Sequence, residues 1–296
     1  MRVMRRPALL VLVSIASAQS GAAFARTLFD DLGAAGVTVL RLGIGSVALA
    51  VITRPRPRTW SAAAWRAAIL LGVAIAGLNL NSYLALRTVP LGVSVTVTFI
   101  GPLLLVLVQT RRLVDLFWAL LAGGGVALLG LGPGVSAPLG GLAFAFCAGL
   151  CGAGYIFFTA RLGGLVPGAG GVTVSLAVAF LVVLPVGAGG ASAVFDRPAL
   201  LLGGAVVALL SAVVPAGLEI SVLRRLPTRV FAVLMSLQPA GGAIAGWLVL
   251  RQRLGPAELT ALAMVTLASV GVTLAHRDPV RATPKGPSVR EHSAGA

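Results

Sequence analysis

The sequence predicts an all-α polytopic membrane protein with ten transmembrane helices, arranged as two inverted five-helix repeats. Three observations predict this fold. The composition is 58% hydrophobic and only 10% charged, with a mean hydropathy of +1.00, whereas about a quarter of the residues in a soluble domain are charged. Apolar runs of helix length recur along the whole chain. Short motifs of the first half also recur, in the same order, in the second half.

Ten apolar segments are the predicted spans. Each is close to the ~20 residues that a helix needs to cross ~30 Å of hydrocarbon. They lie at 8–28, 34–53, 67–86, 90–109, 115–132, 139–159, 171–189, 199–221, 228–249 and 257–275. The arginines before the first segment are also typical of a signal peptide, but this apolar run is long, contains Gln19 and lacks a clear cleavage region. We therefore expect it to be the first span.

The basic charge predicts the orientation in the membrane. The formal net charge is +15. When loops are assigned alternately to the two sides, 17 of the 23 Lys and Arg residues fall on the side of the N-terminus and five on the other. By the positive-inside rule, both termini are predicted to be cytoplasmic in a plasma (inner) membrane. The charge indicates topology and some affinity for anionic lipid heads; nucleic acid is not a predicted partner, because the sequence has no folded basic module.

A duplication explains the recurring motifs. One proline pair of the first half has a counterpart with the same spacing in the second: Pro90 and Pro102, then Pro227 and Pro239. The tetrapeptide GVTV also occurs twice, at 36–39 and again at 171–174. Each repeat holds an odd number of spans, so the second copy starts on the opposite side of the membrane. Such inverted repeats are typical of secondary transporters with a substrate site near the midplane.

The duplication also predicts the domain boundaries. We expect a first repeat at 1–136, with spans one to five, and a second at 137–276, with spans six to ten. The remaining residues, 277–296, are rich in Pro, Ser, Gly and mixed charges, which is typical of a disordered tail.

The prolines predict bends in the fourth and ninth spans. Pro90 and Pro227 lie in the first turn of a span, where the missing N–H loses no partner. Pro102 and Pro239 lie in mid-span, where each frees a carbonyl one turn earlier and bends the helix. Freed backbone at that depth has to be satisfied by protein, water or ligand. We expect these kinks to serve gating around a central cavity; kinks for packing alone are the alternative.

Five stretches of the sequence resemble a known family. They are ARTLF (25–29), GVTVLRLG (36–43), LRTVPLGVSVTVTFIGPL (86–103), RRLVDLFW (111–118) and LEISVLRRLPTRVFAVLMSLQPA (218–240). The chain is similar over nearly its whole length to EamA-domain transporters of the drug/metabolite transporter superfamily, and most of all to their threonine/homoserine exporter branch. The resemblance implies a ten-helix bundle that exports small metabolites, typically amino acids, at the expense of the proton gradient.

The sequence departs from that family at two positions. The family tends to carry one glutamate where this chain has Thr98 and another where it has Gln238, directly before the mid-span proline. The absence of both carboxylates leaves the exact substrate and the coupling chemistry open.

Glu219 is the candidate proton-coupling residue, because it is the one carboxylate clearly inside a predicted span. A charged acid at such depth costs about +2.5 to +3.5 kcal/mol on insertion scales, so it is usually retained for a function. We expect it to take up and release a proton. Arg224 and Arg225 lie only about 7 Å farther along the helix axis. A structural salt bridge near the inner surface is therefore the alternative.

Three side chains in spans two and three are candidate substrate ligands. Arg41 is the clearly intramembrane cation, in the outer half of its span, and a guanidinium suits bidentate capture of a carboxylate. We do not expect it to pair with Glu219, which lies in the inner half. Asn79 and Tyr83 are four residues apart, share a helix face and can line a cavity. The alternatives are ties between neighbouring helices or carbonyls for Arg41 and interhelical hydrogen bonds for the other two.

Polar residues beside the two bends complete the candidate site. Thr98, Ser236 and Gln238 can form part of a binding surface together with the freed backbone groups. For any single hydroxyl, a bond to its own carbonyl one turn back is the alternative. Cys147 and Cys151 are predicted to pack as small apolar side chains. No metal site, cofactor or catalytic group is predicted.

The predicted function is export of a small-molecule solute, by alternating access coupled to protons, with amino acids such as threonine or homoserine as the implied substrates. A different amphiphilic metabolite or a drug is one alternative, and a non-transporting structural or assembly protein is another. An enzyme is not predicted, because the spans lack clustered acids, deep histidines or a nucleophile with a base. The small pair Gly242 and Gly246 permits close helix packing, either within the bundle or in a homodimer.

Overall fold

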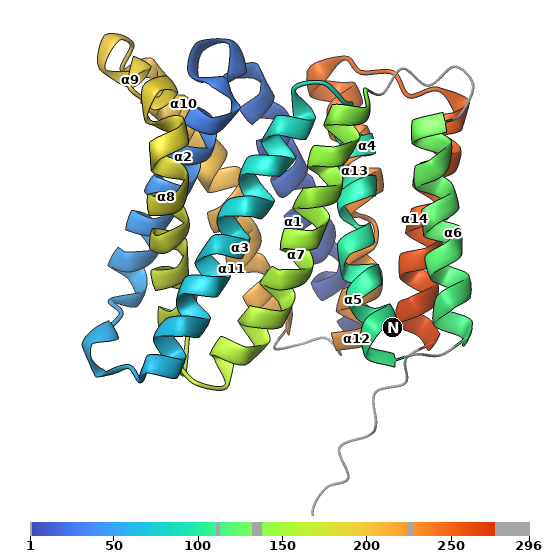
Figure 1. Cartoon of the computed structure of the whole chain (residues 1–296), viewed down its shortest axis with the longest axis horizontal. Helices are drawn as coiled ribbons and strands as arrows, with labels where there is room; N and C mark the ends of the chain where they lie inside the picture. The colour runs from blue at the N-terminus through green and yellow to red at the C-terminus, as the bar shows by residue number, and fades with distance from the viewer. Residues whose placement is uncertain (1, 111–112, 132–137, 224–227, 276–296) are drawn as a thin grey trace, which may run out of the picture.

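The computed structural model describes residues 2–110, 113–131, 138–223 and 228–275. These residues form long helices that run side by side between the two ends of the molecule, and no β-strand occurs among them (Figure 1). The predicted tail, 277–296, lies outside the described residues.

The helices of the first half coincide with the predicted spans. They are α1 (Arg2–Thr27), α2 (Phe29–Thr53), α3 (Ala62–Leu86), α4 (Leu91–Thr98), α5 (Ile100–Thr110) and α6 (Leu113–Leu131), with a 3-10 turn, η1 (Pro57–Thr59), between α2 and α3. Helix α2 has non-helical backbone at Gly33, with φ 65°. A positive φ of this kind favours glycine, which has no Cβ. The break lies directly before residue 34, where the span was predicted to begin.

The helices of the second half also follow the prediction. They are α7 (Leu139–Gly163), α8 (Gly170–Ala191), the short α9 (Ala193–Asp196), α10 (Ala199–Ala208), the π turn η2 (Leu209–Val213), α11 (Val214–Leu223), α12 (Thr228–Met235), α13 (Gln238–Leu250) and α14 (Pro256–Ala275). The predicted eighth span is thus one continuous helical segment with a π turn in its middle.

The length and low polarity of these helices fit a multi-pass membrane protein. Eight helical segments of the described residues are long and apolar enough to cross a membrane. Two shorter apolar helices, Leu91–Leu105 and Leu116–Leu129, correspond to the predicted fourth and fifth spans. Large apolar side chains are exposed on the outside of the bundle, including Leu202 (71%) and Leu120 (67%). Such a surface suits contact with lipid and not with water.

Both mid-span prolines follow a break in a helix. Helix α4 ends at Thr98, and Phe99 separates it from α5. Helix α12 ends at Met235, and two residues separate it from α13. Pro102 is the third residue of α5, and Pro239 is the second of α13. The two proline pairs differ by a constant offset in residue number. The same offset relates the first residue of α4 to that of α12, and the last residue of α4 to that of α12. The two breaks therefore occur at equivalent positions.

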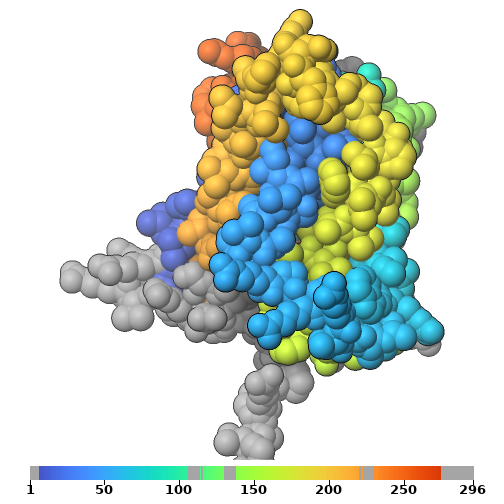
Figure 2. Space-filling model, turned by 90° about the vertical axis from the view of Figure 1, so that its left-hand side faces the viewer, coloured from blue at the N-terminus to red at the C-terminus, as the bar shows by residue number. Residues whose placement is uncertain are grey.

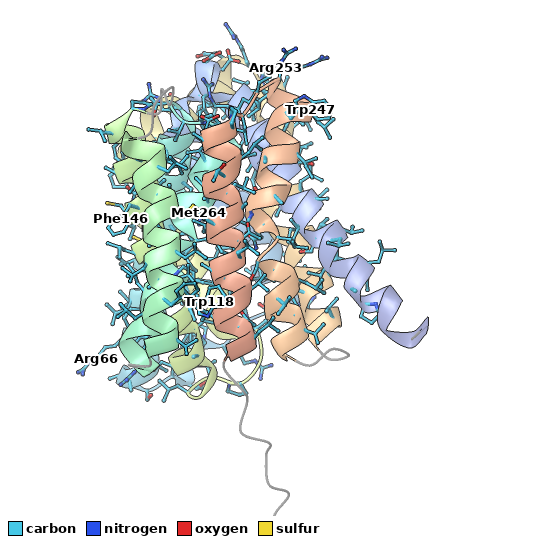
Figure 3. The ribbon with its side chains drawn as sticks, turned by 90° about the vertical axis from the view of Figure 1, so that its right-hand side faces the viewer. Arg66, Trp118, Phe146, Trp247, Arg253 and Met264 are labelled. Atoms are coloured by element: carbon cyan, nitrogen blue, oxygen red, sulfur yellow. The ribbon has the colours of Figure 1, made fainter. Side chains whose placement is uncertain are left out.

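The two halves of the chain pack extensively against each other. Helix α2 packs along α8, α3 along α7, and α6 along α14, while α1 packs against η2, α11 and α13. Helices α1 and α7 occupy corresponding places in the two halves, yet α1 ends at the top of Figure 1 and α7 ends at the bottom. Arg66 and Arg253 mark these opposite ends in Figure 3.

Glycines permit the closest helix contacts. A Cβ added to Gly101 of α5 would overlap the carbonyl oxygen of Gly149 in α7. In α13, Gly242 and Gly246 are buried inside the bundle, where they face Val95 and Leu91 of α4. Both glycines of this small pair therefore serve packing within the chain.

Candidate functional site

Arg41 joins three helical elements near the middle of the bundle. Its Nη1 donates a hydrogen bond to the hydroxyl of Tyr83 in α3 at 3.3 Å. Its Nη2 donates to the backbone carbonyl of Ser211, in η2, at 3.1 Å. The guanidinium carbon lies 5.6 Å from the centroid of the Tyr83 ring, a cation–π distance. These contacts hold the cation between the first half of the chain and the second.

The surroundings of Arg41 fix its position. Tyr83 is buried, with 2% of its surface exposed, and its ring lies 5.6 Å from that of Phe29. Ser211 lies in a π turn, a departure from the α-helical hydrogen-bond pattern that is frequent at functional sites. A guanidinium has several N–H donors in a planar fork, and these two hydrogen bonds use only part of that set. The remaining donors can bind a carboxylate.

Glu219 has a different partner. The hydroxyl of Ser14 in α1 donates a hydrogen bond to Oε1 of Glu219 in α11 at 3.0 Å. Ser14 is buried, with 1% exposed, whereas Glu219 is only partly buried. One turn farther along α1, the hydroxyl of Ser17 donates to the carbonyl of Leu210 at 2.7 Å. Helix α1 is thus bound to the segment that carries Glu219 at two levels.

The acid and the cation are separate features of the bundle. Ser211, which binds Arg41, and Glu219 are eight residues apart on one segment, or about 12 Å along a helix axis. Arg41 and Glu219 are therefore not paired with each other, as expected. The alternative partners proposed for Glu219, Arg224 and Arg225, lie outside the described residues.

Two other candidates hydrogen-bond to backbone carbonyls. The Asn79 amide donates to the carbonyl of Ile75, one turn back in α3, at 2.8 Å. The Thr98 hydroxyl donates to the carbonyl of Ser94 at 2.8 Å and lies 3.3 Å from that of Ala145 in α7. In this conformation Asn79 makes the local bond that an amide or hydroxyl commonly makes in a helix, and Thr98 adds a contact with the neighbouring helix.

The candidates beside the second break lie against other elements. The hydroxyls of Ser236 and of Ser269, in α14, are 2.8 Å apart. The Gln238 amide lies 4.0 Å from the sulfur of Met235. The structure thus brings Arg41 and Tyr83 together, but it does not bring Thr98, Ser236 or Gln238 to them.

Helix α1 supplies polar residues that the sequence analysis did not include in the site. Besides Ser14, it carries Gln19, which is 6% exposed. A Cβ on Gly242 of α13 would lie 3.5 Å from Oε1 of Gln19, so the amide lies directly against this glycine face. The presence of several polar residues in the first predicted span was the sequence signal that could have indicated their place in the site. Gln19 served only as evidence against a signal peptide.

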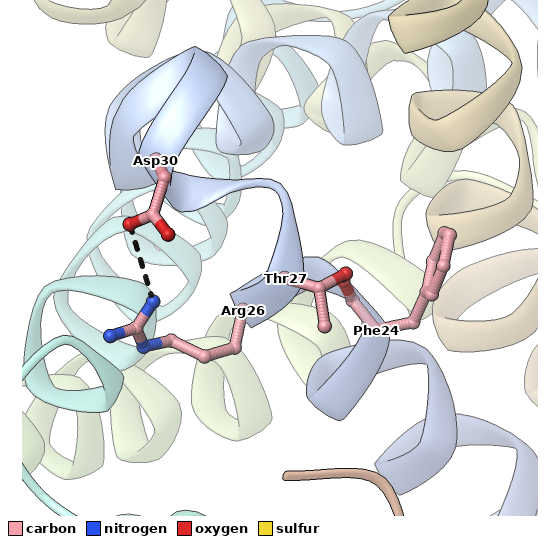
Figure 4. A network of polar contacts seen from close by, with 4 residues as sticks. All are labelled: Phe24, Arg26, Thr27 and Asp30. Carbon is pink, nitrogen blue, oxygen red and sulfur yellow. Dashed lines mark hydrogen bonds and ion pairs between the residues drawn. The ribbon is translucent and has the colours of Figure 1, made fainter.

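Arg26 lies at the end of α1, outside this polar region. Its Nη1 is 3.9 Å from Oδ1 of Asp30, and its guanidinium lies 5.4 Å from the ring of Phe29. The hydroxyl of Thr27 donates to the carbonyl of Phe24 at 2.7 Å. Figure 4 shows Phe24, Arg26, Thr27 and Asp30 at the turn between α1 and α2. The contacts of Arg26 belong to this turn.

Two hollows lie on the side of the molecule formed by α2 and α8, which Figure 2 shows. One, of about 820 Å³, is an apolar groove along α2, α8 and α9, lined by residues such as Val47 and Phe180. The other, of about 710 Å³, lies at the connections between α2 and α3 and between α7 and α8. Among the described residues, no group of three His, Cys, Asp or Glu side chains could hold a metal ion.

Comparisons with known proteins show which family and which fold this chain resembles. The profile of the EamA-like transporter family matches residues 139–274. Two proteins described as "Threonine/homoserine exporter RhtA", from Escherichia coli (strain K12) and Salmonella typhimurium (strain LT2), are 39% and 38% identical to this chain over 273 residues, which is 92% of either chain. One solved structure, described as "Crystal structure of protein", has the same fold at 15% identity, with a TM-score of 0.59 over 91% of this chain and 97% of that one.

Proposed function

Because the chain belongs to the EamA-like transporter family, in its threonine/homoserine exporter branch, we propose that it exports small amino acids, threonine and homoserine among them, across the plasma (inner) membrane. The observation that carries this proposal is the 39% identity, over 92% of the chain, to a curated threonine/homoserine exporter. The chain is a transporter and not an enzyme. Its solute is a small molecule that it handles within the membrane.

The proposed architecture is ten spans in two inverted repeats, at 1–136 and 137–276. The equal lengths of α4 and α12 support this architecture. The packing of α2 against α8 and of α6 against α14 also supports it, because each pair joins the second or the fifth predicted span of one half to the same span of the other half. Two such repeats can exchange their arrangements, which opens a midplane site to either side of the membrane in turn. Helix breaks before Pro102 and Pro239 are the proposed gating points.

The proposed orientation has both termini in the cytoplasm. Several arginines assigned to inner loops, among them Arg54, Arg58 and Arg66, belong to the connection between α2 and α3 and to the start of α3. This connection lies at the bottom of Figure 1, where α7 also ends. The opposite end carries Arg87, Arg197 and Arg253. The larger number of predicted inner arginines supports the cytoplasmic assignment of the lower end.

Arg41 is the proposed ligand of the substrate carboxylate. Every amino-acid substrate carries this group, and a guanidinium binds it with two parallel hydrogen bonds. The Tyr83 ring and the Ser211 carbonyl hold the guanidinium in place and leave it further donors. The contact with η2 also connects the substrate ligand to the second half of the chain, whose movement would release the substrate.

Glu219 is the proposed proton carrier. Partial burial and the Ser14 hydrogen bond place it where protonation would change the contact between α1 and α11. Loss of a proton leaves an acceptor for the Ser14 hydroxyl, whereas gain of a proton weakens that hydrogen bond, because a charged acceptor binds more strongly. Protonation can therefore alter how the two helices pack.

Four further residues belong to the proposed binding surface: Asn79, Thr98, Ser236 and Gln238. In the conformation seen here their polar groups contact backbone carbonyls, another hydroxyl or a sulfur. A solute would have to replace these contacts. This makes them secondary ligands, which act when the helix breaks move.

Flux measurements in proteoliposomes test the proposed function. The purified chain is reconstituted into liposomes that are loaded with labelled threonine or homoserine. Efflux of the label is measured with and without an imposed pH step, and protein-free liposomes are the control. Efflux that depends on the protein and on the pH step is expected. Efflux of an amphiphilic metabolite or drug without threonine efflux would favour the other transport function. No solute flux at all would favour a structural or assembly role.

A further inference from the structure

The hollow at the connections between α2 and α3 and between α7 and α8 has the features of a binding site, and we call it the basic hollow. It has a volume of about 710 Å³, within the ~300–1,000 Å³ that is usual for small-ligand sites. Residues 53–56 and 59–61 line one side, and residues 165–170 line the other. It lies at the lower edge of the face shown in Figure 2, and neither Arg41 nor Glu219 lines it.

The charge that lines the basic hollow is uniformly positive. Arg54 and Arg56 both belong to its wall, and none of the described residues that line it is Asp or Glu. The ion pairs found among the described side chains involve Arg26 and Arg197, at the other end of the bundle. Two cations in a concave wall whose described residues include no acid attract an anion.

The backbone around the basic hollow has a defined conformation and adds positive partial charge to that of the arginines. Arg54 ends α2 in a left-handed conformation, with φ 44°, and its N–H donates to the Ala50 carbonyl at 2.9 Å. Helices α3 and α8 begin beside the hollow, after Ser61 and Ala169, and helix N-termini carry a partial positive charge. Arginine side chains and two helix starts therefore converge on one space.

Aromatic residues place the basic hollow at the level of the membrane surface. Trp60 lines the hollow, and its ring lies 5.8 Å from that of Trp65. Tryptophans are enriched at membrane–water interfaces, where the lipid head groups lie. The neighbouring surface of α2 and α8 is apolar, as the acyl chains of a lipid require. Basic pockets between transmembrane helices are known to accommodate anionic head groups.

We propose that the basic hollow binds an anionic phosphate group, supplied by the head group of an acidic membrane phospholipid, with Arg54 and Arg56 as its ligands. Guanidinium groups bind phosphate oxygens in a bidentate manner. The proposal does not depend on the transported solute, because the basic hollow lies apart from the residues proposed for transport. Soluble phosphate shares the same chemistry and is the competing source.

Lipid titration tests this proposal on the full chain in detergent. Native mass spectrometry gives apparent Kd values for phosphatidylglycerol and for phosphatidylcholine with the same acyl chains. We expect wild type to prefer phosphatidylglycerol. The double variant Arg54→Gln/Arg56→Gln should bind it at least about tenfold more weakly, since charge-assisted hydrogen bonds are lost. Arg58→Gln/Arg66→Gln is the matched control, because it removes the same charge from residues that do not line the hollow.

Two further measurements assign the source and check the fold. Millimolar inorganic phosphate that displaces the lipid in wild type, but not in the Arg54→Gln/Arg56→Gln variant, would identify soluble phosphate as an occupant of the same site. A circular-dichroism spectrum of Arg54→Gln/Arg56→Gln equal to that of wild type checks the fold, and Arg54→Lys/Arg56→Lys should recover part of the affinity because it restores the positive charge. Equal phosphatidylglycerol affinity in the two double variants, or no preference over phosphatidylcholine in wild type, would overturn the proposal.

Discussion

Arg41 and Tyr83 form one unit in which the guanidinium both donates to the phenol oxygen, at 3.3 Å, and lies 5.6 Å from the ring centroid. The two residues are 42 positions apart and come from α2 and α3. The same guanidinium reaches the Ser211 carbonyl in the second half of the chain. A cation that is held in this way at a fixed position can bind a substrate carboxylate without a large loss of side-chain entropy.

Replacement of Arg41 tests its role as the carboxylate ligand. Arg41→Lys keeps the charge but loses the planar fork of donors. We expect threonine efflux from proteoliposomes to fall at least about tenfold, which corresponds to the loss of one charge-assisted hydrogen bond of ~1.5–3 kcal/mol. Arg66→Lys, at the lower end of the bundle, is the control and should transport like wild type. Unchanged efflux by Arg41→Lys would exclude the proposed role.

Glu219→Gln tests proton coupling. The amide keeps the size and the hydrogen-bond acceptor for Ser14 but cannot carry a proton. We expect efflux driven by a pH step to fall to the level measured without the step, while the amount of protein in the membrane stays the same. Asp196 is an exposed acid at the end of α9, and Asp196→Asn is the control, which should still increase its efflux when the pH step is imposed. A normal response of Glu219→Gln to the pH step would remove Glu219 from the mechanism.

The positions of the helices could be predicted from the sequence, whereas the partners of the polar residues could not. Hydropathy fixes where a span starts and ends, because each residue contributes locally; the predicted span 34–53 begins directly after the break at Gly33. The hydrogen bond between Ser14 and Glu219 joins residues 205 positions apart. Such a contact depends on which helices pack together, and local periodicity contains no such information.

Two features of the candidate site show the same limit. The π turn at Leu209–Val213 has the sequence LLSAV, which contains no proline or glycine from which a departure from the α-helix could be predicted. The sequence predicted that Asn79 can line a cavity or form an interhelical hydrogen bond; in the structure its amide donates to the carbonyl of Ile75 in its own helix. A backbone carbonyl one turn back is always within reach of such a side chain, so helix-face reasoning cannot choose between this carbonyl and a ligand.

The mid-span prolines provide a test of gating. In Pro102→Ala and Pro239→Ala the restored N–H can close the hydrogen bond that the proline prevents, so the helix can continue across the break. We expect the double variant to reach the membrane normally and to transport several-fold more slowly. Pro185→Ala is the matched control, because Pro185 lies within the uninterrupted helix α8. If the double variant transports as fast as Pro185→Ala, the breaks serve packing alone.

The contact between α5 and α7 predicts a stability effect. Gly101→Ala places a methyl group against the carbonyl of Gly149, and overpacking of this kind costs about 1–3 kcal/mol. We expect a lower midpoint of thermal unfolding in detergent. Gly123→Ala in α6 is the control: its Cβ would meet nothing within 4 Å, so its midpoint should be unchanged or slightly higher. A midpoint of Gly101→Ala at or above that of wild type would contradict the close packing of these helices.

Accessibility of engineered cysteines tests the inverted duplication most directly. In the proposed duplication, Arg26 and Arg161 are equivalent residues; they lie near the ends of α1 and α7, each at the same distance before a GVTV motif. Arg26→Cys and Arg161→Cys are made in a Cys147→Ser/Cys151→Ser background and exposed in intact cells to a thiol reagent that does not cross the membrane. The account predicts labelling of the first from outside and of the second only after the cells are opened. Labelling of both from the same side would contradict the inverted arrangement of the two repeats.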